Sequence, residues 1–148
     1  MNDPDAPSAF PEGSPVWLKQ QEMFKGTDNA YQLAKKYKIK TAFGTDNLFS
    51  ASNAAIQGKQ LTRLKKWYNN AEILQMATSG NAELLTLSGP RNPYPGKLGV
   101  VEEGAYADLL LVNGNPLENL DLVADPEANF SVIMKDGAIY KNTMAAAR

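Results

Sequence analysis

The sequence predicts an α+β fold in which helices come first and a small β-sheet unit follows. Apolar residues recur at helical spacing as far as Leu87, whereas from Gly96 onward they form short extended runs separated by turns. Two of these runs, Phe130–Met134 and Ala138–Tyr140, flank the dipeptide Asp136-Gly137, which is the strongest hairpin signal in the chain. We therefore expect two packed helices before Gly89, followed by a sheet that contains one tight hairpin.

Length and composition limit what the chain can be. With 148 residues it has the size of one ordinary domain, and it is too short for a complete (β/α)8 barrel, which needs about 250 residues. Its composition is that of a globular protein, and a net charge of −1 gives no general attraction to nucleic acid or to an anionic membrane. The chain has no cysteine and no histidine, which excludes disulfides and a Ser-His-Asp mechanism but does not decide the compartment.

The N-terminal part is predicted to be an irregular arm followed by helix. Residues 1–15 contain four prolines and few apolar residues, so they favour neither a helix nor a central strand. Val16–Lys25 fits a short helix loosely. The tetrapeptide Gly-Thr-Asp-Asn at Gly26–Asn29 then precedes an apolar stripe with helical spacing, so we predict that Thr27 or Asp28 is the N-cap of a second helix.

A second copy of this tetrapeptide, Gly44–Asn47, has a different context. It follows Ile39–Phe43, a short run that resembles a strand, so Asp46 is predicted to leave the C-terminal end of that strand. In α/β folds, functional sites lie at this end of the strands. Asp46 is therefore the main candidate for a functional side chain.

Two helical stretches are predicted after this loop. Ala54–Tyr68 reads as an amphipathic helix whose apolar side carries Leu61, Leu64 and Tyr68. Asn69 then begins an Asn-x-x-Glu capping box, and the helix that it starts is predicted to end at Gly80.

The last part of the chain is predicted to be helix and then strand. A short helix over Asn81–Leu87 is expected to end with a left-handed glycine at Gly89. Extended runs follow at Leu98–Val101 and Asp108–Val112, before the hairpin, and residues 143–148 are predicted to be a tail.

Three separate pieces of the sequence resemble a known family in both order and spacing. They are K-T-A-F-G-T-D at Lys40–Asp46, A-T-S-G-N-A-E-L-L-T-L-S-G at Ala77–Gly89, and G-K-L-G-V-V-E-E-G-A-Y-A-D-L-L-L-V-N-G-N-P at Gly96–Pro116. From about Val16 to Asn142 the chain resembles the C-terminal third of the amidohydrolase superfamily, and it is most similar to the imidazolonepropionase-like and prolidase-like members.

This resemblance implies a domain organisation. Proteins of that family are (β/α)8 barrels, and their last barrel strand ends in an aspartate before helices and a small β-sandwich. Residues 16–95 would then be the C-terminal barrel segment with its last strand and helices, and residues 96–142 would be part of the β-sandwich. The predicted fold is therefore a C-terminal fragment of the barrel joined to an incomplete sandwich.

The resemblance also implies a catalytic role for Asp46. In the family, the corresponding aspartate binds a divalent metal, with zinc as the expected ion, and takes the proton from the metal-bound water. The histidine ligands of the family are absent from this chain. We therefore expect the isolated chain to hold no metal cofactor and to be inactive, and Asp46 is the single catalytic and metal-binding position that carries over.

Other polar residues are given structural or surface roles. Asp108, in the Ala-Asp-Leu sequence before a strand, is predicted to take part in a turn and to form a hydrogen bond with local backbone, without a catalytic role. The remaining acidic residues show no calcium-loop pattern and are predicted to lie on the solvated surface: Asp3, Asp5, Asp121, Asp125 and Glu127. The basic cluster of Lys59, Arg63, Lys65 and Lys66 beside Trp67 and Tyr68 is predicted to be a wet helix face and not a nucleic-acid surface.

Two functions are compatible with these observations. The first is the C-terminal segment of a metal-dependent hydrolase acting on C–N bonds of amides, cyclic amides or peptides, with the missing N-terminal barrel portion as its partner. The second is a non-enzymatic module, derived from an amidohydrolase, that associates with itself or with another chain. An unpaired barrel strand would leave free backbone groups and an apolar patch, so self-association is the expected consequence of the second function.

Overall fold

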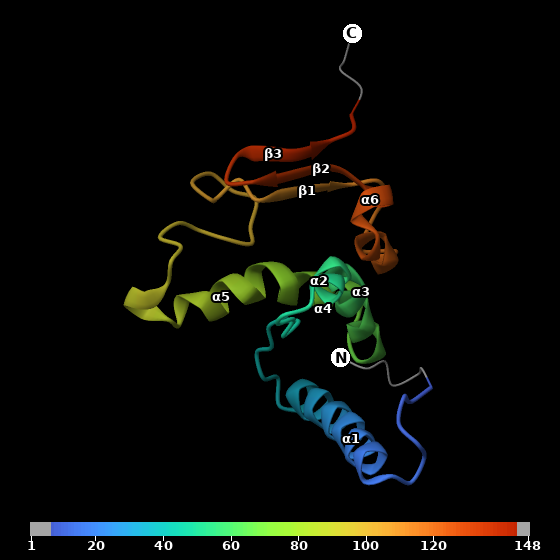
Figure 1. Cartoon of the computed structure of the whole chain (residues 1–148). Coiled ribbons are helices and arrows are strands. Elements are labelled where there is room, and N and C mark those ends of the chain that lie inside the picture. Colours follow the sequence, from blue (N-terminus) through green and yellow to red (C-terminus); the bar gives the residue numbers. More distant parts are fainter. Residues whose placement is uncertain (1–6, 145–148) are drawn as a thin grey trace. The chain divides into compact units, whose positions relative to one another are not determined.

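The structure of the chain is a computed structural model that describes residues 7–144 (Figure 1). It divides into two compact units, Met1–Lys40 and Thr41–Arg148. Residues 1–6 of the predicted arm and residues 145–148 of the predicted tail lie outside the described residues. Within residues 7–144, no helix combines the length and apolar character that crossing a membrane requires.

The first unit contains one long helix, α1 (Pro15–Lys36). Its N-cap is Ser14, whose side chain accepts a hydrogen bond from the Trp17 backbone N–H at 3.2 Å, and a proline occupies the first helical position. Residues 7–14 form no helix or strand, as expected for the described part of the arm. The predicted helix at Val16–Lys25 is confirmed but is much longer than expected.

The predicted N-cap at the first Gly-Thr-Asp-Asn copy is wrong, because Gly26–Asn29 lies inside α1. The Thr27 hydroxyl does not cap a new helix and instead donates to the Met23 carbonyl oxygen at 2.9 Å, one turn back in the same helix. Glycine in a helix interior costs only about 1 kcal/mol relative to alanine. The helix-forming residues on both sides of Gly26 therefore carry the helix through it.

The predicted strand at Ile39–Phe43 is also absent. Residues 39–48 have no regular secondary structure, and they appear in Figure 1 as the teal coil between α1 and α2. A strand requires a neighbouring strand to accept and donate its backbone hydrogen bonds. The three strands found within residues 7–144 pair with one another, so among these residues no strand lies beside this segment.

The next predicted helix, Ala54–Tyr68, has the buried side that was predicted, but it is interrupted and forms shorter elements. It consists of α2 (Ala51–Ala55), α3 (Gln57–Thr62) and the 3-10 turn η1 (Arg63–Lys66), with the break at Ile56. Leu61, Leu64 and Tyr68 are buried, as the apolar stripe predicts. The periodicity therefore identified the buried face correctly.

The capping box at Asn69 is confirmed. The Asn69 side chain accepts from the Glu72 N–H at 2.9 Å, and the Glu72 carboxylate accepts from the Asn69 N–H at 2.8 Å, at the start of α4 (Asn70–Gln75). This helix places Ile73, which is 0% exposed, at the centre of the core.

The predicted helix end at Gly80 is wrong. A π-helical turn, η2 (Met76–Gly80), joins α4 directly to α5 (Asn81–Thr86), so the helix runs through the glycine. Glycine suits this position, because a Cβ there would lie only 3.0 Å from the Gln75 carbonyl oxygen of the π-helical turn. After α5 comes the short turn η3 (Gly89–Arg91), and Gly89 has the predicted left-handed conformation, with φ +55°.

A three-stranded antiparallel sheet forms the C-terminal part, in the order β1 (Leu109–Val112), β2 (Phe130–Lys135), β3 (Ala138–Asn142). The predicted hairpin is confirmed, since Lys135 pairs with Ala138 across Asp136-Gly137, both with positive φ. The run Leu98–Val101 does not form a strand, and only an isolated bridge joins Lys97 to Ala105 nearby.

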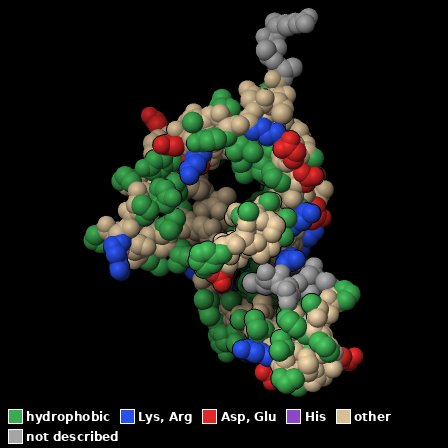
Figure 2. All heavy atoms as spheres, viewed as in Figure 1, with side chains coloured by type: hydrophobic (Ala, Val, Ile, Leu, Met, Phe, Trp, Pro, Cys, Tyr) green, Lys and Arg blue, Asp and Glu red, His purple; other side chains and the backbone are tan. Residues whose placement is uncertain are grey.

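The helices and the sheet are linked through the connection between β1 and β2, which contains η4 (Leu120–Ala124) and α6 (Pro126–Asn129). η4 packs on α3, and its Leu120 is only 1% exposed. The sheet itself is poorly covered, because Leu109, Leu110, Leu111 and Ile139 are all exposed. Figure 2 shows hydrophobic side chains at the surface of the sheet region and an opening between the sheet and α5.

Candidate functional site

The candidate site lies on Thr41–Phe49, called the Asp46 segment below. Although this segment forms no strand, side chains from two helices hold its backbone. Near its start, the Phe43 N–H donates to the Asn81 side-chain oxygen at 2.8 Å, and Asn81 is the first residue of α5. The segment is thereby attached to the helical core at the point where a barrel strand was predicted.

A second attachment lies directly after Asp46. The side-chain amides of Asn47 and Gln60 form a reciprocal pair, in which each nitrogen donates to the other's oxygen at 3.1 Å. The same Asn47 nitrogen donates to the Asn53 carbonyl oxygen at 2.9 Å. Gln60 belongs to α3 and is 9% exposed, so the Asp46 segment is anchored to a buried position of the core.

Between these two attachments, Asp46 projects into solvent. Its side chain is exposed and forms no hydrogen bond or ion pair with any residue that the structure describes. Its backbone is left-handed, with φ +50°, a conformation that aspartate tolerates better than most residues. The prediction that Asp46 follows a strand is therefore wrong, whereas its accessibility is what a reacting carboxylate requires.

The apolar residues that follow Asp46 are also exposed. Leu48 and Phe49 have large exposed side chains, and Phe49 has a positive φ of +58°. A left-handed conformation is unfavourable for a bulky residue, and exposing an aromatic ring forgoes its hydrophobic burial. This end of the Asp46 segment therefore presents an apolar surface beside a carboxylate.

The residues of this chain do not fit a metal site by themselves. Across residues 7–144, no three His, Cys, Asp or Glu side chains are grouped so that they could hold a metal ion together. A catalytic zinc is usually held by three protein ligands, and this chain offers neither histidine nor cysteine. Asp46 can supply one oxygen ligand or one proton acceptor, and a complete site needs groups from elsewhere.

Three aspartates that were predicted to lie at a turn or on the surface contact other groups of the described chain. The Asp108 carboxylate accepts from the Asp136 N–H at 2.7 Å and so ties the hairpin turn to the start of β1. Asp121 pairs with Lys65 at 2.5 Å, and Asp125 accepts from the Ala128 N–H at the start of α6. Asp108 therefore bonds to backbone at a turn, but the prediction that this backbone is local is wrong, because Asp136 lies 28 positions away.

The basic cluster on η1 is partly occupied within the protein. Lys65 is paired with Asp121, and the Lys66 ammonium lies 5.2 Å from the centre of the Trp67 ring. Tyr68 is buried and cannot stack on a base. These contacts favour the solvated-face interpretation of the cluster.

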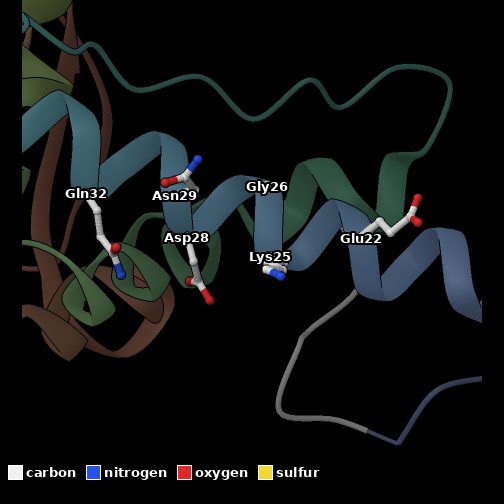
Figure 3. A pocket seen from close by; sticks show the side chains of 6 residues that line it. All are labelled: Glu22, Lys25, Gly26, Asp28, Asn29 and Gln32. Atoms are coloured by element: carbon white, nitrogen blue, oxygen red, sulfur yellow. The ribbon is translucent and has the colours of Figure 1, made fainter.

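A shallow hollow follows one side of α1. It is lined by Glu22, Lys25, Gly26, Asp28, Asn29 and Gln32, all of them from that helix. Figure 3 shows Asp28 and Asn29 leaving the helix in opposite directions, so these side chains do not converge on a common point. The hollow therefore lacks the convergent polar groups of a ligand site.

Sequence reasoning missed Gln60 and Asn81, the two side chains that hold the Asp46 segment. The signal for Gln60 was its place next to Leu61 on the buried side of an amphipathic stretch, where an unpaired amide is costly. No local pattern linked either residue to Asp46, because the contacts span 13 and 38 positions.

Comparison with known proteins identifies the family. Residues 22–145 match the model of the amidohydrolase family, and the chain belongs to that family. An ochratoxinase of Aspergillus niger is 31% identical over 130 residues, which cover 84% of this chain and 24% of that protein. This chain therefore spans about a quarter of the length of that relative.

Solved structures give the same result. The crystal structure of an amidohydrolase superposes with a TM-score of 0.67 and 30% identity, covering 79% of this chain and 26% of the other. A prolidase complexed with N-methylphosphonate-L-proline gives a TM-score of 0.64 and 30% identity, covering 78% and 26%. The A. niger ochratoxinase structure, at 24% identity, covers 89% of this chain and 28% of its own, with a TM-score of 0.72, and supports the fold. The predicted resemblance to amidohydrolases is thus confirmed.

Proposed function

We propose that this chain is the C-terminal segment of a metal-dependent hydrolase that cleaves C–N bonds in amides, cyclic amides or peptides. Membership of the amidohydrolase family supports the hydrolase class, and the relatives named ochratoxinase and prolidase support an amide or peptide substrate. The three sequence pieces that end at Asp46, Gly89 and Pro116 support a place near the imidazolonepropionase-like and prolidase-like members.

The observation that carries this proposal is the exposed carboxylate of Asp46 on a backbone segment that Asn81 and Gln60 anchor. We propose that it accepts a proton from the water that attacks the substrate carbonyl and passes this proton to the leaving nitrogen. One carbon–oxygen bond forms, the carbon–nitrogen bond breaks, and the carboxylate returns to its starting state. Asp46 would also be this chain's ligand to the divalent metal, with zinc as the expected ion, of the complete hydrolase.

We further propose that the chain is inactive by itself and that its partner is the N-terminal barrel portion. Two observations on residues 7–144 support this: no three His, Cys, Asp or Glu side chains form a group that could hold a metal, and no strand pairs with the Asp46 segment. The exposed apolar residues of the sheet and at Leu48 and Phe49 would be covered by that partner.

The test is a complementation assay. The N-terminal portion of the related prolidase, which lacks the region matched here, is produced together with this chain, and hydrolysis of proline dipeptides and N-acyl amino acids is measured. We expect no hydrolysis with either part alone, activity with both parts, and loss of that activity with Asp46→Asn. Activity that persists in Asp46→Asn would contradict the role of Asp46.

Metal content tests the isolated chain separately. Elemental mass spectrometry is carried out on the chain purified without a metal-affinity step, at a known protein concentration. We expect far less than one zinc, manganese or iron ion per chain. A stoichiometric metal would show that Asp46 has partners within the chain and would contradict its inactivity alone.

The alternative function is a non-enzymatic module that associates with itself. The exposed apolar side chains of β1 and β3 favour it, since both are edge strands. Light scattering after size exclusion, at several concentrations, measures this association directly. Dimers or larger species without complementation activity would support the alternative, and a monomer at all concentrations would contradict it.

A further inference from the structure

The reciprocal amide pair between Asn47 and Gln60 joins the Asp46 segment to the core. Gln60 lies at a buried position of α3, next to Leu61, where an apolar residue could fill the same space. Replacing both partners of a buried hydrogen bond by apolar groups is often close to neutral, whereas an unpaired amide is costly. Because both amides are paired, the contact fixes the orientation of the two side chains as well as filling buried space.

The backbone next to this pair has little other support. Asp46 has a left-handed φ of +50°, and the residues on either side of it form no helix or strand. The other side-chain anchor described above, from Asn81, lies three residues earlier at Phe43. Asn47 is the residue directly after Asp46. The two hydrogen bonds between the side chains of Asn47 and Gln60 therefore hold the backbone that follows the aspartate.

A paired amide fixes orientation better than a single hydrogen bond. Each of the two side chains donates once and accepts once, so neither amide can be flipped without losing both bonds. The bond from Asn47 to the Asn53 carbonyl oxygen uses the remaining donor of the Asn47 nitrogen. Rotation of Asn47 about its side-chain bonds is thereby restricted, and the neighbouring backbone with it.

We propose that Gln60 is a positioning residue that acts through Asn47 to fix the direction in which Asp46 presents its carboxylate. A role of Gln60 in catalysis rests on the proposed function of Asp46, whereas the effect of Gln60 on the conformation of the Asp46 segment does not. Gln60 does not contact the reacting groups itself. Misplacing a reacting group by a small distance is enough to lower a catalytic rate strongly.

The first test measures backbone order in the 15N-labelled full chain by nuclear magnetic resonance relaxation. In the parent chain we expect backbone order parameters of about 0.85 at Thr45 and Asp46. In Gln60→Leu we expect these values to fall below about 0.6. The matched control is Gln57→Leu, the same change in the same helix at an exposed glutamine. We expect the control to leave the order of the Asp46 segment unchanged.

Rescue by a conservative exchange separates positioning from general stability. The double variant Asn47→Gln/Gln60→Asn keeps an amide pair with the same combined side-chain length, and we expect it to restore most of the lost order. If Gln60→Leu fails to fold, Gln60→Glu takes its place, because it keeps length and acceptor but loses the donor to the Asn47 oxygen. A folded Gln60→Leu with unchanged order at Asp46, or an equal loss of order at Ile73 in the core, would overturn the proposal.

The second test uses the complementation assay. We expect Gln60→Leu to lower kcat by about tenfold with KM within about twofold, and the double variant to recover kcat. A loss confined to KM would overturn the catalytic part of the proposal. If the parent chain shows no activity on complementation, the proposed function fails, and the relaxation measurements still decide whether Gln60 orders the Asp46 segment.

Discussion

The close approach of α3 to η4 at Gly58 gives the most direct test of the packing within the second unit. A Cβ built on Gly58 would lie 2.0 Å from the Val123 carbonyl oxygen and 3.1 Å from the Ala124 Cα. Both atoms belong to backbone, so no side chain can rotate away to make room. Gly58→Ala must therefore push α3 and η4 apart.

The expected change in the free energy of unfolding follows from two opposing contributions. Ordinary van der Waals contact begins near 3.4 Å, so the helix and the turn must separate by more than 1 Å along this contact. Overpacking of a well-packed contact typically costs about 1–3 kcal/mol, and replacing glycine by alanine in a helix gains up to about 1 kcal/mol. Because the clash is severe, we expect Gly58→Ala to lower the free energy of unfolding by about 2 kcal/mol.

Urea unfolding followed by Trp67 fluorescence measures this change. Trp67 directly follows η1 in the second unit, and a Trp17→Phe background removes the signal of α1. The control is Gly26→Ala, a helical glycine whose added Cβ would have no atom within 4 Å apart from its own helix backbone and chain neighbours, and this change should increase the helicity of α1 in circular dichroism. If Gly58→Ala is as stable as its parent, α3 and η4 do not approach as described, and the reasoning is refuted.

Three further changes probe the capping box, the hairpin and the candidate site. Asn69→Ala removes the N-cap of α4 and should lower the free energy of unfolding by about 1 kcal/mol in urea, whereas an unchanged value would argue against the capping box. Gly137→Ala places a side chain at φ +75° in the hairpin turn and should cost about 1–2 kcal/mol; a neutral effect would mean that the turn has another conformation. Asp46→Asn should change the urea stability by less than about 0.5 kcal/mol, because the exposed carboxylate has no partner among residues 7–144, while abolishing complementation activity; a large loss of stability would reveal a structural role.

Local sequence signals predicted the features that depend on neighbouring residues. The Asn-x-x-Glu pattern predicted the capping box at Asn69, and Asp136-Gly137 predicted the hairpin, because both motifs close within a few residues. The helical repeat of Leu61, Leu64 and Tyr68 predicted a buried face, since one side of an amphipathic helix must face the core. These signals need no information from distant parts of the chain.

Local sequence signals failed where the same residues were compatible with two backbone conformations. The sequence around Gly26 and Gly80 suggested helix ends, yet the helix continues through both glycines. The cost of one glycine is small, and flanking helical residues outweigh it. At Ile39–Phe43 the composition favoured a strand, but a strand forms only where a partner supplies backbone hydrogen bonds.

For the candidate site, the sequence by itself determined which carboxylate to consider and which chemistry the chain lacks. The Gly-Thr-Asp motif pointed to Asp46, and the absence of histidine and cysteine limited what the chain offers a metal. Only the tertiary structure decided how Asp46 is held, because Asn81 and Gln60 reach its segment from helices that lie far along the chain. Amide side chains carry no local signature of their partners, so this anchoring emerges only when the helices have packed.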